Sequence, residues 1–239
     1  MPLPLTVSVI IPALNEAGNI ADLVAAVWAQ PVQQVVVVDN GSSDDTGARA
    51  AEAGALVVRE ERRGYGYACA AGVAVADGEI LVFLDGDFSF SPDEMPRLME
   101  PIQRGKADLV LGSRTQGTIL PGAMPSHQRF GNRLTAGLMR LLYGVAVTDL
   151  GPYRAVRRDL LLGLGMGEMT YGWPTEMMVK AARQGARIIE VPVSYAPRRA
   201  GQSKVSGTLR GSLLAGWHIL GVTLRYSLAG RNRTTDRRG

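Results

Sequence analysis

The sequence predicts an α/β fold with a mostly parallel central sheet. Runs of β-branched and other apolar residues recur along its first half, and the runs at 34–39 and 79–84 show no alternation with polar residues, as is typical of strands buried on both faces. Segments with helical spacing separate these runs, a pattern that indicates βαβ units. With 239 residues, of which 46% are hydrophobic, the chain can build one large core.

Strands and helices are expected to alternate through the first half of the chain. The strands expected there are residues 8–12, 34–39, 56–59, 79–84 and 109–111. The helices expected between them are residues 16–30, 44–53 and 65–76, and we expect Asn15 to cap the first of them.

The second half begins with an amphipathic helix over residues 128–143, which carries Arg129, Arg133 and Arg140 on its polar side. The elements expected after it are a helix at 174–184 that ends near Gly185, a strand at 187–195, a basic loop at 197–207 and a long amphipathic helix at 205–228. We therefore expect one α/β domain over residues 1–207, followed by an amphipathic helix and basic tail over 208–239.

Composition excludes several classes of protein. One cysteine, Cys69, forms no disulfide framework, and with His127 and His218 it is too sparse for a zinc site. The N-terminus lacks the pattern of a signal peptide, so we expect a cytoplasmic protein. The apolar run at 211–224 is shorter than the ~20 residues that span a bilayer. Its helix is expected to lie on a membrane surface or to pack on the domain.

Acidic residues follow the buried strands at one edge of the expected sheet. Asp85-Gly86-Asp87 comes directly after the fourth strand, and Asp39 closes the second. The carboxyl edge of a parallel sheet is where α/β folds bind ligands. Two carboxylates there can share one hard divalent cation that keeps positions open for substrate phosphates. The alternative is a solvated acidic loop, and Asp44 fits a simple helix cap.

The order of several motifs resembles the family 2 glycosyltransferases, and within them the dolichyl- and polyprenyl-phosphate mannosyl- and glucosyltransferases. The resemblance runs from about residue 7 to residue 207. The motifs that carry it are residues 9–16 (VIIPALNE), 37–46 (VVDNGSSDDT), 85–87 (DGD), 63–66 (RGYG), 112–114 (GSR), 149–154 (DLGPYR), 175–177 (TEM), 190–193 (EVPV) and 201–204 (GQSK).

This resemblance implies a GT-A fold that binds a nucleoside-diphosphate sugar with a divalent cation, Mg²⁺ or Mn²⁺. The positions that would bind the nucleotide sugar are Pro12, Leu14, Glu16, Asp39, Asp85 and Gly86. Asp87 would be the principal metal ligand, with Asp85 and Ser89 beside it. The cation would neutralise charge on the leaving nucleotide.

The reaction that the resemblance implies is an inverting transfer of a hexose to a lipid phosphate. Such a phosphate is already ionised near neutral pH, so the reaction needs no general base. It needs cations that hold two anionic substrates together, and arginine suits that role. The candidates are Arg114, Arg129, Arg133, Arg154, Arg199 and Lys204. Arg114, Arg154 and Lys204 match family motifs, whereas a solvated helix face explains Arg129 and Arg133 equally well.

Other functions stay open. A soluble hydroxyl acceptor would need a base, for which Glu176 is the candidate. Met177 follows it where relatives that glycosylate saccharides often carry Asp, and this departure weakens that alternative. A sugar-nucleotide-binding protein without catalysis is a further alternative. Nucleic-acid binding is not expected, because the basic tail at 231–239 has no aromatic residues for base stacking.

The net charge of +4 conceals two parts of opposite sign. Residues 197–239 hold nine Lys and Arg and one Asp, a net charge of +8, whereas residues 1–196 hold 17 basic and 21 acidic residues, a net charge of −4. We therefore expect the C-terminal segment to bring the enzyme to the cytoplasmic face of an anionic membrane, where the lipid acceptor lies.

Overall fold

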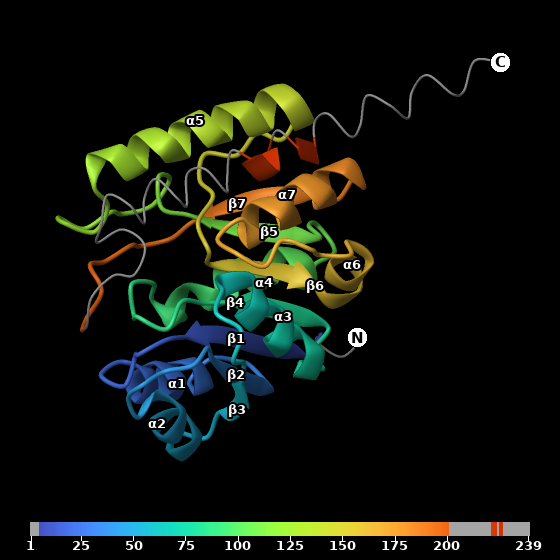
Figure 1. The fold of residues 1–239 in the computed structure, drawn as a ribbon. Helices are drawn as coiled ribbons and strands as arrows, with labels where there is room; N and C mark the ends of the chain where they lie inside the picture. Colours follow the sequence, from blue (N-terminus) through green and yellow to red (C-terminus); the bar gives the residue numbers. More distant parts are fainter. Residues whose placement is uncertain (1–4, 201–220, 224, 227–239) are drawn as a thin grey trace.

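The computed structural model describes residues 5–200, 221–223 and 225–226. Within these residues, seven strands form one sheet in the order β3-β2-β1-β4-β6-β5-β7 (Figure 1). The strands are β1 (Val7–Ala13), β2 (Gln34–Asp39), β3 (Leu56–Arg59), β4 (Ile80–Phe83), β5 (Leu109–Ser113), β6 (Arg154–Arg157) and β7 (Ile188–Pro192).

The helices lie on both faces of this sheet. They are α1 (Ile20–Trp28), α2 (Thr46–Glu52), α3 (Tyr65–Val75), α4 (Met95–Gln103), α5 (Ser126–Tyr143), α6 (Arg158–Gly163) and α7 (Trp173–Arg183), with a short 3-10 turn at Pro92–Glu94. Strands β1 to β4 pair in parallel, and so do β5 and β7. Only β6, between β4 and β5, runs antiparallel to its neighbours. The predicted α/β fold with a mostly parallel sheet is confirmed.

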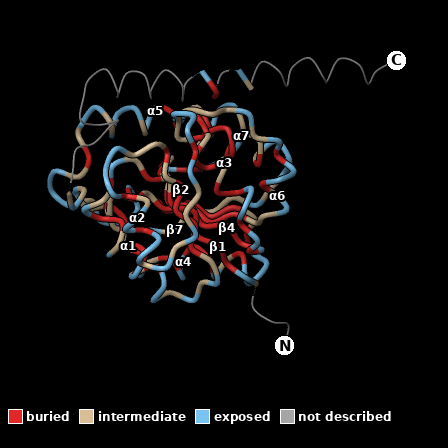
Figure 2. The backbone as a smooth tube through the Cα atoms, turned by 60° about the horizontal axis from the view of Figure 1, so that its bottom comes forward, coloured by how far each residue is buried: buried red, intermediate tan, exposed pale blue. Residues whose placement is uncertain are grey.

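The central strands are buried on both faces, as their unbroken apolar sequences predicted. In β1, Val9 and Ile11 face a core that α1 and α4 complete, whereas Ile10 faces a second core built with α3 and α7. Alternate residues of β2 and β4 divide in the same way. Figure 2 shows these strands as the buried centre of the molecule. The result is a three-layer arrangement that holds the carboxyl ends of the strands rigidly at one edge.

The expected start of the first helix was wrong. α1 begins at Ile20, its N-cap is Asn19, and Asn15 adopts a left-handed conformation with φ 52°. The side chain of Asn15 instead accepts a hydrogen bond from the backbone N–H of Ser43, at 2.8 Å. Residues 16–19 form a turn in which the Glu16 carbonyl accepts the N–H groups of Asn19 and Ile20. Residues 15–19 therefore belong to the loop before α1 and not to the helix.

Three elements were not predicted: α4, β6 and α6. β6 has only four residues, and two of them are the arginines Arg154 and Arg157. A run so short and so charged does not have the composition of a central strand, yet β6 is paired on both sides. Its place in the sheet therefore depends on contacts between residues distant in sequence.

The expected C-terminal helix at 205–228 lies mostly outside the described residues, and Lys204 does too. The part that is described packs on the domain. Val222 and Thr223 are buried, and the Tyr143 hydroxyl on α5 donates to the Thr223 carbonyl. No helix within the described residues combines the length and hydropathy that crossing a bilayer requires.

Candidate active site

The loops that follow β1 and β2 are tied together by hydrogen bonds. The Asn15 N–H donates to the Ser42 hydroxyl at 2.9 Å, and the Glu16 N–H donates to the Thr46 hydroxyl at 2.8 Å. The Asp44 carboxylate accepts the Thr46 N–H at 3.1 Å, although the N-cap residue of α2 is Asp45 rather than Asp44. Both loops are therefore fixed relative to each other at the carboxyl edge of the sheet.

Asp39 closes β2 at this edge, with its Oδ1 2.8 Å from the Ser42 N–H that it accepts. The next residue, Asn40, holds the loop that leads into α3. Its amide donates to the carbonyls of Glu60 and Arg62, at 3.0 and 2.8 Å, and its oxygen accepts the Gly64 N–H at 3.0 Å. The glycine-containing loop before α3 therefore lies beside Asp39.

Residues 85–89 form a tight turn directly after β4. The Asp87 Oδ1 accepts the Ser89 N–H at 3.0 Å, and Phe88 has a positive φ of 61°, which is costly for a bulky residue. Such strain persists only where the surrounding structure imposes it, and it is common at functional sites. A Cβ atom on Gly86 would lie 3.4 Å from the Pro12 carbonyl oxygen, so this turn packs against the end of β1.

The two carboxylates of this turn repel each other. Burial first, and then the charge of Asp87, raises the pKa of Asp85 to about 7, although the guanidinium of Arg114 acts in the opposite direction. The Tyr65 hydroxyl at the start of α3 donates to Asp85 Oδ1 at 3.5 Å. A cation between the carboxylates would remove this repulsion, because it favours both ionised forms.

The turn has a further feature that suits a bound cation. Ser89 is buried, and its hydroxyl oxygen has no hydrogen-bond partner within the described part of the chain. Buried polar atoms normally have a partner, so this oxygen is suited to accept a ligand. In the same part of the chain, no three Asp, Glu, His or Cys side chains gather closely enough to hold a metal ion. The residues therefore fit Mg²⁺ or Mn²⁺ only if a substrate phosphate supplies other ligands.

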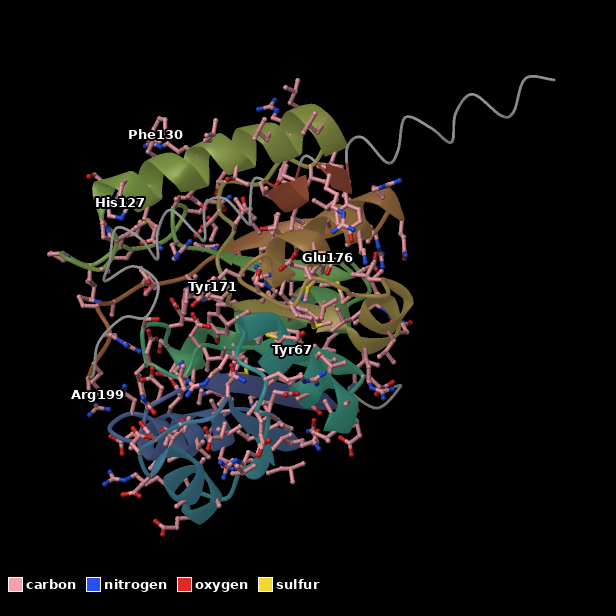
Figure 3. The ribbon with its side chains drawn as sticks, in the orientation of Figure 1. Tyr67, His127, Phe130, Tyr171, Glu176 and Arg199 are labelled. Atoms are coloured by element: carbon pink, nitrogen blue, oxygen red, sulfur yellow. The ribbon has the colours of Figure 1, made fainter. Side chains whose placement is uncertain are left out.

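Arginines face the acidic turn from the loop after β7. Arg198 Nη2 lies 2.5 Å from Glu16 Oε1 and 3.5 Å from Asp87 Oδ2, and thus joins the β1 and β4 loops. Its neighbour Arg199 is exposed, pairs with Asp22 at 3.0 Å and lies over the Phe88 ring. Figure 3 shows Arg199 on the side of the molecule toward which β1 runs. Sequence reasoning chose Arg199 and missed Arg198, because composition alone does not distinguish two adjacent arginines in a loop.

Arg114 and Arg154 are both buried behind this turn. Arg114 forms a two-pronged ion pair with Asp149, with nitrogen–oxygen distances of 2.8 and 2.7 Å. Arg154 donates to backbone carbonyls, among them that of Pro174 at 2.8 Å, and burial lowers its pKa to about 10. Both guanidinium groups act on the charge of Asp85. Arg154 thus holds the backbone of neighbouring loops in place. Arg114 supplies a positive charge near Asp85, and its ion pair with Asp149 fixes the orientation of the guanidinium group.

Glu176, at the start of α7, accepts four hydrogen bonds. Its Oε2 accepts the N–H groups of Gly167 and Glu168, and its Oε1 accepts the Tyr226 hydroxyl at 2.6 Å and Lys180 Nζ at 2.9 Å. Burial acts to raise the pKa of Glu176, but these hydrogen bonds outweigh it and lower the pKa. The geometry gives no support to Glu176 as a general base.

The structure thus brings together most of the residues selected from the sequence. Those at the carboxyl edge are Pro12, Glu16, Asp39, Asp85, Gly86, Asp87, Ser89 and Arg199, with Leu14 in the loop after β1. Arg129 and Arg133 lie exposed on α5 instead. Arg198, Tyr65 and Asp149 were not selected, and only their contacts identify them.

Comparisons with known proteins agree with this geometry. The sequence pattern of glycosyl transferase family 2 matches residues 8–164. An uncharacterized glycosyltransferase of Mycobacterium tuberculosis is 41% identical over 209 residues, which cover 87% of this chain and 94% of that protein. The undecaprenyl-phosphate mannosyltransferase of Micrococcus luteus is 34% identical over 240 residues, which cover 93% and 94% of the two chains.

A solved structure has the same architecture. Glucosyl-3-phosphoglycerate synthase of Mycobacterium tuberculosis, in complex with Mn²⁺, uridine diphosphate and phosphoglyceric acid, superposes with a TM-score of 0.74 at 25% identity. The match covers 93% of this chain and 78% of that one. Fold, motif order and these relatives agree: the chain belongs to glycosyl transferase family 2 and is a hexosyltransferase of the GT-A fold.

Proposed function

We propose that this hexosyltransferase moves a hexose from a nucleotide sugar to a polyprenyl phosphate. The observation that carries the proposal is the strained turn holding Asp85 and Asp87, with the buried hydroxyl of Ser89 beside it and Arg198 against it. This arrangement suits a diphosphate with its cation. The similarity to an undecaprenyl-phosphate mannosyltransferase over nearly the whole chain supports the lipid acceptor.

The nucleotide sugar, of the GDP-mannose or UDP-glucose type, would bind along the carboxyl edge of the sheet. Asp39 would accept hydrogen bonds from the base or ribose, and the β1 loop with Pro12, Leu14 and Glu16 would cover the nucleoside. Asp85, Asp87 and Ser89 would hold Mg²⁺ or Mn²⁺. When bound, this cation supplies Lewis-acid stabilisation of the charge that develops on the leaving diphosphate.

The chemical step is a displacement at the anomeric carbon with inversion. An oxygen of the lipid phosphate forms the new bond to that carbon, and the bond from the carbon to the donor diphosphate breaks with its electron pair. Because the phosphate, with a second pKa of about 6, is already ionised, no side chain has to remove a proton. This agrees with the fully hydrogen-bonded state of Glu176, which fits a positioning role.

Cationic side chains would hold the two anionic substrates at contact distance. Arg198 lies 3.5 Å from Asp87 in the acidic turn, and Arg199 is exposed beside it. A guanidinium offers several donors in a fixed plane, which suits phosphate oxygens. Arg114 would act through its positive charge from behind Asp85 rather than by touching a substrate, because its Nε and Nη2 atoms are both bound to Asp149. Lys204, outside the described residues, matches a family motif and stays a candidate.

The test is transfer from labelled GDP-mannose and UDP-glucose to a polyprenyl phosphate in detergent, with Mg²⁺ or Mn²⁺. We expect a glycolipid product and at least about a hundredfold slower transfer by Asp87→Ala. The matched control is Asp159→Asn, because Asp159 lies on α6 and pairs with Arg157. If Asp87→Ala is as fast as the parent enzyme, the proposed metal site is wrong.

A second candidate acceptor is a small phosphorylated molecule. It is favoured by the superposition on glucosyl-3-phosphoglycerate synthase, whose structure contains phosphoglyceric acid. The same assay with phosphoglyceric acid in place of the lipid separates the two. Transfer to the soluble acceptor alone would replace the lipid in the proposal and leave the donor site unchanged.

The expected membrane contact of residues 208–239 is also part of the proposal. Its support is the net charge of +8 in residues 197–239. Co-sedimentation with anionic vesicles should weaken when residues 208–239 are deleted. Binding that is unaffected by the deletion would contradict a role for this segment.

A further inference from the structure

Helix α5 presents an apolar stripe to the outside of the molecule. Phe130 is 71% exposed, Leu141 78% and Leu134 46%. The opposite side of the same helix is buried, with Thr135 and Met139 against the domain. Figure 3 shows Phe130 pointing away from the body of the protein. The helix thus already has its inner contact, and the stripe is additional to it.

The helical spacing makes this stripe continuous. At 100° per residue, Phe130, Leu134 and Leu141 fall within an arc of about 40°. Met139 lies roughly opposite the centre of this arc. Single exposed apolar residues are ordinary, but an aligned set on one helix marks an interaction surface.

Basic residues line one edge of the stripe. Arg129, Arg133 and Arg140 fall within another arc of about 40°, directly beside the apolar one. All three are exposed. The sequence of α5 contains no Asp or Glu in its 18 residues. A partner for this face must therefore be apolar at its centre and negatively charged beside it.

We propose that the outward face of α5 docks on the surface of an anionic lipid bilayer. A helix with an apolar stripe, an aromatic residue and arginines beside it suits the boundary between acyl chains and headgroups. The arginines would lie among lipid phosphates, where each basic residue adds to the attraction. The helix is about 27 Å long and would lie flat in the surface.

This docking would also orient the active site. His127, near the start of α5, and Arg199, at the acidic turn, lie on the same side of the molecule in Figure 3. The start of α5 therefore points to the same side of the molecule as the edge that a lipid phosphate has to reach. The functional role of this docking rests on the proposed lipid acceptor. The docking itself can be measured as vesicle binding, which does not require the enzyme to transfer any sugar.

The experiment is co-sedimentation of the full chain with vesicles of phosphatidylglycerol and phosphatidylcholine. The double variant Phe130→Ser/Leu141→Ser should bind at least about tenfold more weakly. The matched control is Leu162→Ser, which removes a leucine that is 52% exposed on α6. Thermal unfolding of each variant checks folding, and Arg140→Gln should weaken binding to anionic vesicles only.

Each outcome bears on the proposal. Equal vesicle binding by the double variant and the parent would overturn it, as would a parent protein that does not bind anionic vesicles. A parent that elutes as a dimer and a double variant that elutes as a monomer, with equal vesicle binding, would assign the stripe to a second copy instead. If the double variant loses vesicle binding and the parent transfers no sugar to lipid, the docking stands and the proposed acceptor fails.

With transfer established, a second readout links docking to the acceptor. The double variant should lose transfer to polyprenyl phosphate embedded in vesicles and keep transfer to a short-chain, water-soluble polyprenyl phosphate. Equal loss on both acceptors would show damage to the enzyme rather than to docking, and would count against the proposal.

Discussion

Glu176 connects the last described residues of the chain to the loop that supports α3. One oxygen of its carboxylate accepts hydrogen bonds from the Tyr226 hydroxyl and the Lys180 ammonium group. The other oxygen accepts hydrogen bonds from the N–H groups of Gly167 and Glu168. Both oxygens must accept, so an ionised carboxylate is the group that fits. A glutamine in its place would turn an N–H donor toward one of these pairs of donors.

We predict that Glu176→Gln lowers the free energy of unfolding by about 1–3 kcal/mol at pH 7. The folded-state pKa of Glu176 lies below its ordinary value, so its stabilisation is present above about pH 4.3 and is lost as the pH falls through the lower folded-state pKa. Urea unfolding of both proteins from pH 7 to pH 3 measures this. A difference that stays constant over the whole range would contradict the prediction.

Arg198 supplies a second prediction about a single residue. Because it lies between Glu16 and Asp87, its loss leaves two carboxylates without that positive charge. We expect Arg198→Ala to lower kcat/KM for the nucleotide sugar by about tenfold to a hundredfold. Arg104→Ala, which breaks an exposed pair with Glu100, is the control and should leave kcat/KM unchanged.

The residues of the site were predictable to different degrees. Asp39, Asp85 and Asp87 could be selected because each lies at the end of a strand or shortly after it. The carboxyl ends of parallel strands meet at one edge of the sheet. Arg198 could not, because its partner Glu16 is 182 positions away. The sequence suggested Glu176 as a candidate base, but it showed nothing of the four donors around it. Partners that come from distant elements decide a side chain's role.

At the scale of elements, the loop at 167–169 packs tightly on the start of α3. The Gly66 N–H donates to the Met169 carbonyl at 3.1 Å. A Cβ atom on Gly66 would lie 2.5 Å from both the Glu168 carbonyl oxygen and Met169 Cα. Those are backbone atoms, which cannot move aside as a flexible side chain can. Glycine at 66 thus allows α3 to bring Tyr65 to Asp85.

We therefore expect Gly66→Ala to destabilise the protein by about 1–3 kcal/mol and to slow transfer. The matched control is Gly131→Ala within α5, where a Cβ atom would meet nothing within 4 Å. That substitution should instead stabilise the protein by up to about 1 kcal/mol, because alanine is the better helix former. Chemical denaturation of both variants measures the contrast, and equal effects would contradict it.

Element prediction succeeded where the local pattern was strong. The apolar runs of β2 and β4 are continuous, and both became central strands. It failed for β6, whose short charged sequence is held by pairing with β4 and β5. It also failed at the start of α1. Asn15 is a residue type that often caps helices, but its side chain accepts a hydrogen bond from Ser43 instead. In both cases a tertiary contact outweighed local preference.

For the whole molecule, ligand binding should raise the free energy of unfolding. A nucleoside diphosphate with Mn²⁺ that binds only the folded protein, at a hundred times its Kd, adds about 2.7 kcal/mol. For a protein of this size that raises Tm by about 5–10 °C. Comparing GDP with UDP identifies the base, and Asp87→Ala should lose the part of the shift that needs Mn²⁺. The same shift in the variant would contradict metal binding at Asp87.

One consequence follows from the antiparallel direction of β6. An antiparallel strand starts at the edge where its parallel neighbours end, so the chain leaves β5 and enters β6 at the same place, where the Gly112 N–H donates to the Tyr153 carbonyl at 2.8 Å. Everything between, α5 included, is a cassette with adjoining ends. Such a cassette can change in length or sequence without altering the strand order, provided that Arg114 and Asp149, which lie in it and pair behind Asp85, are kept.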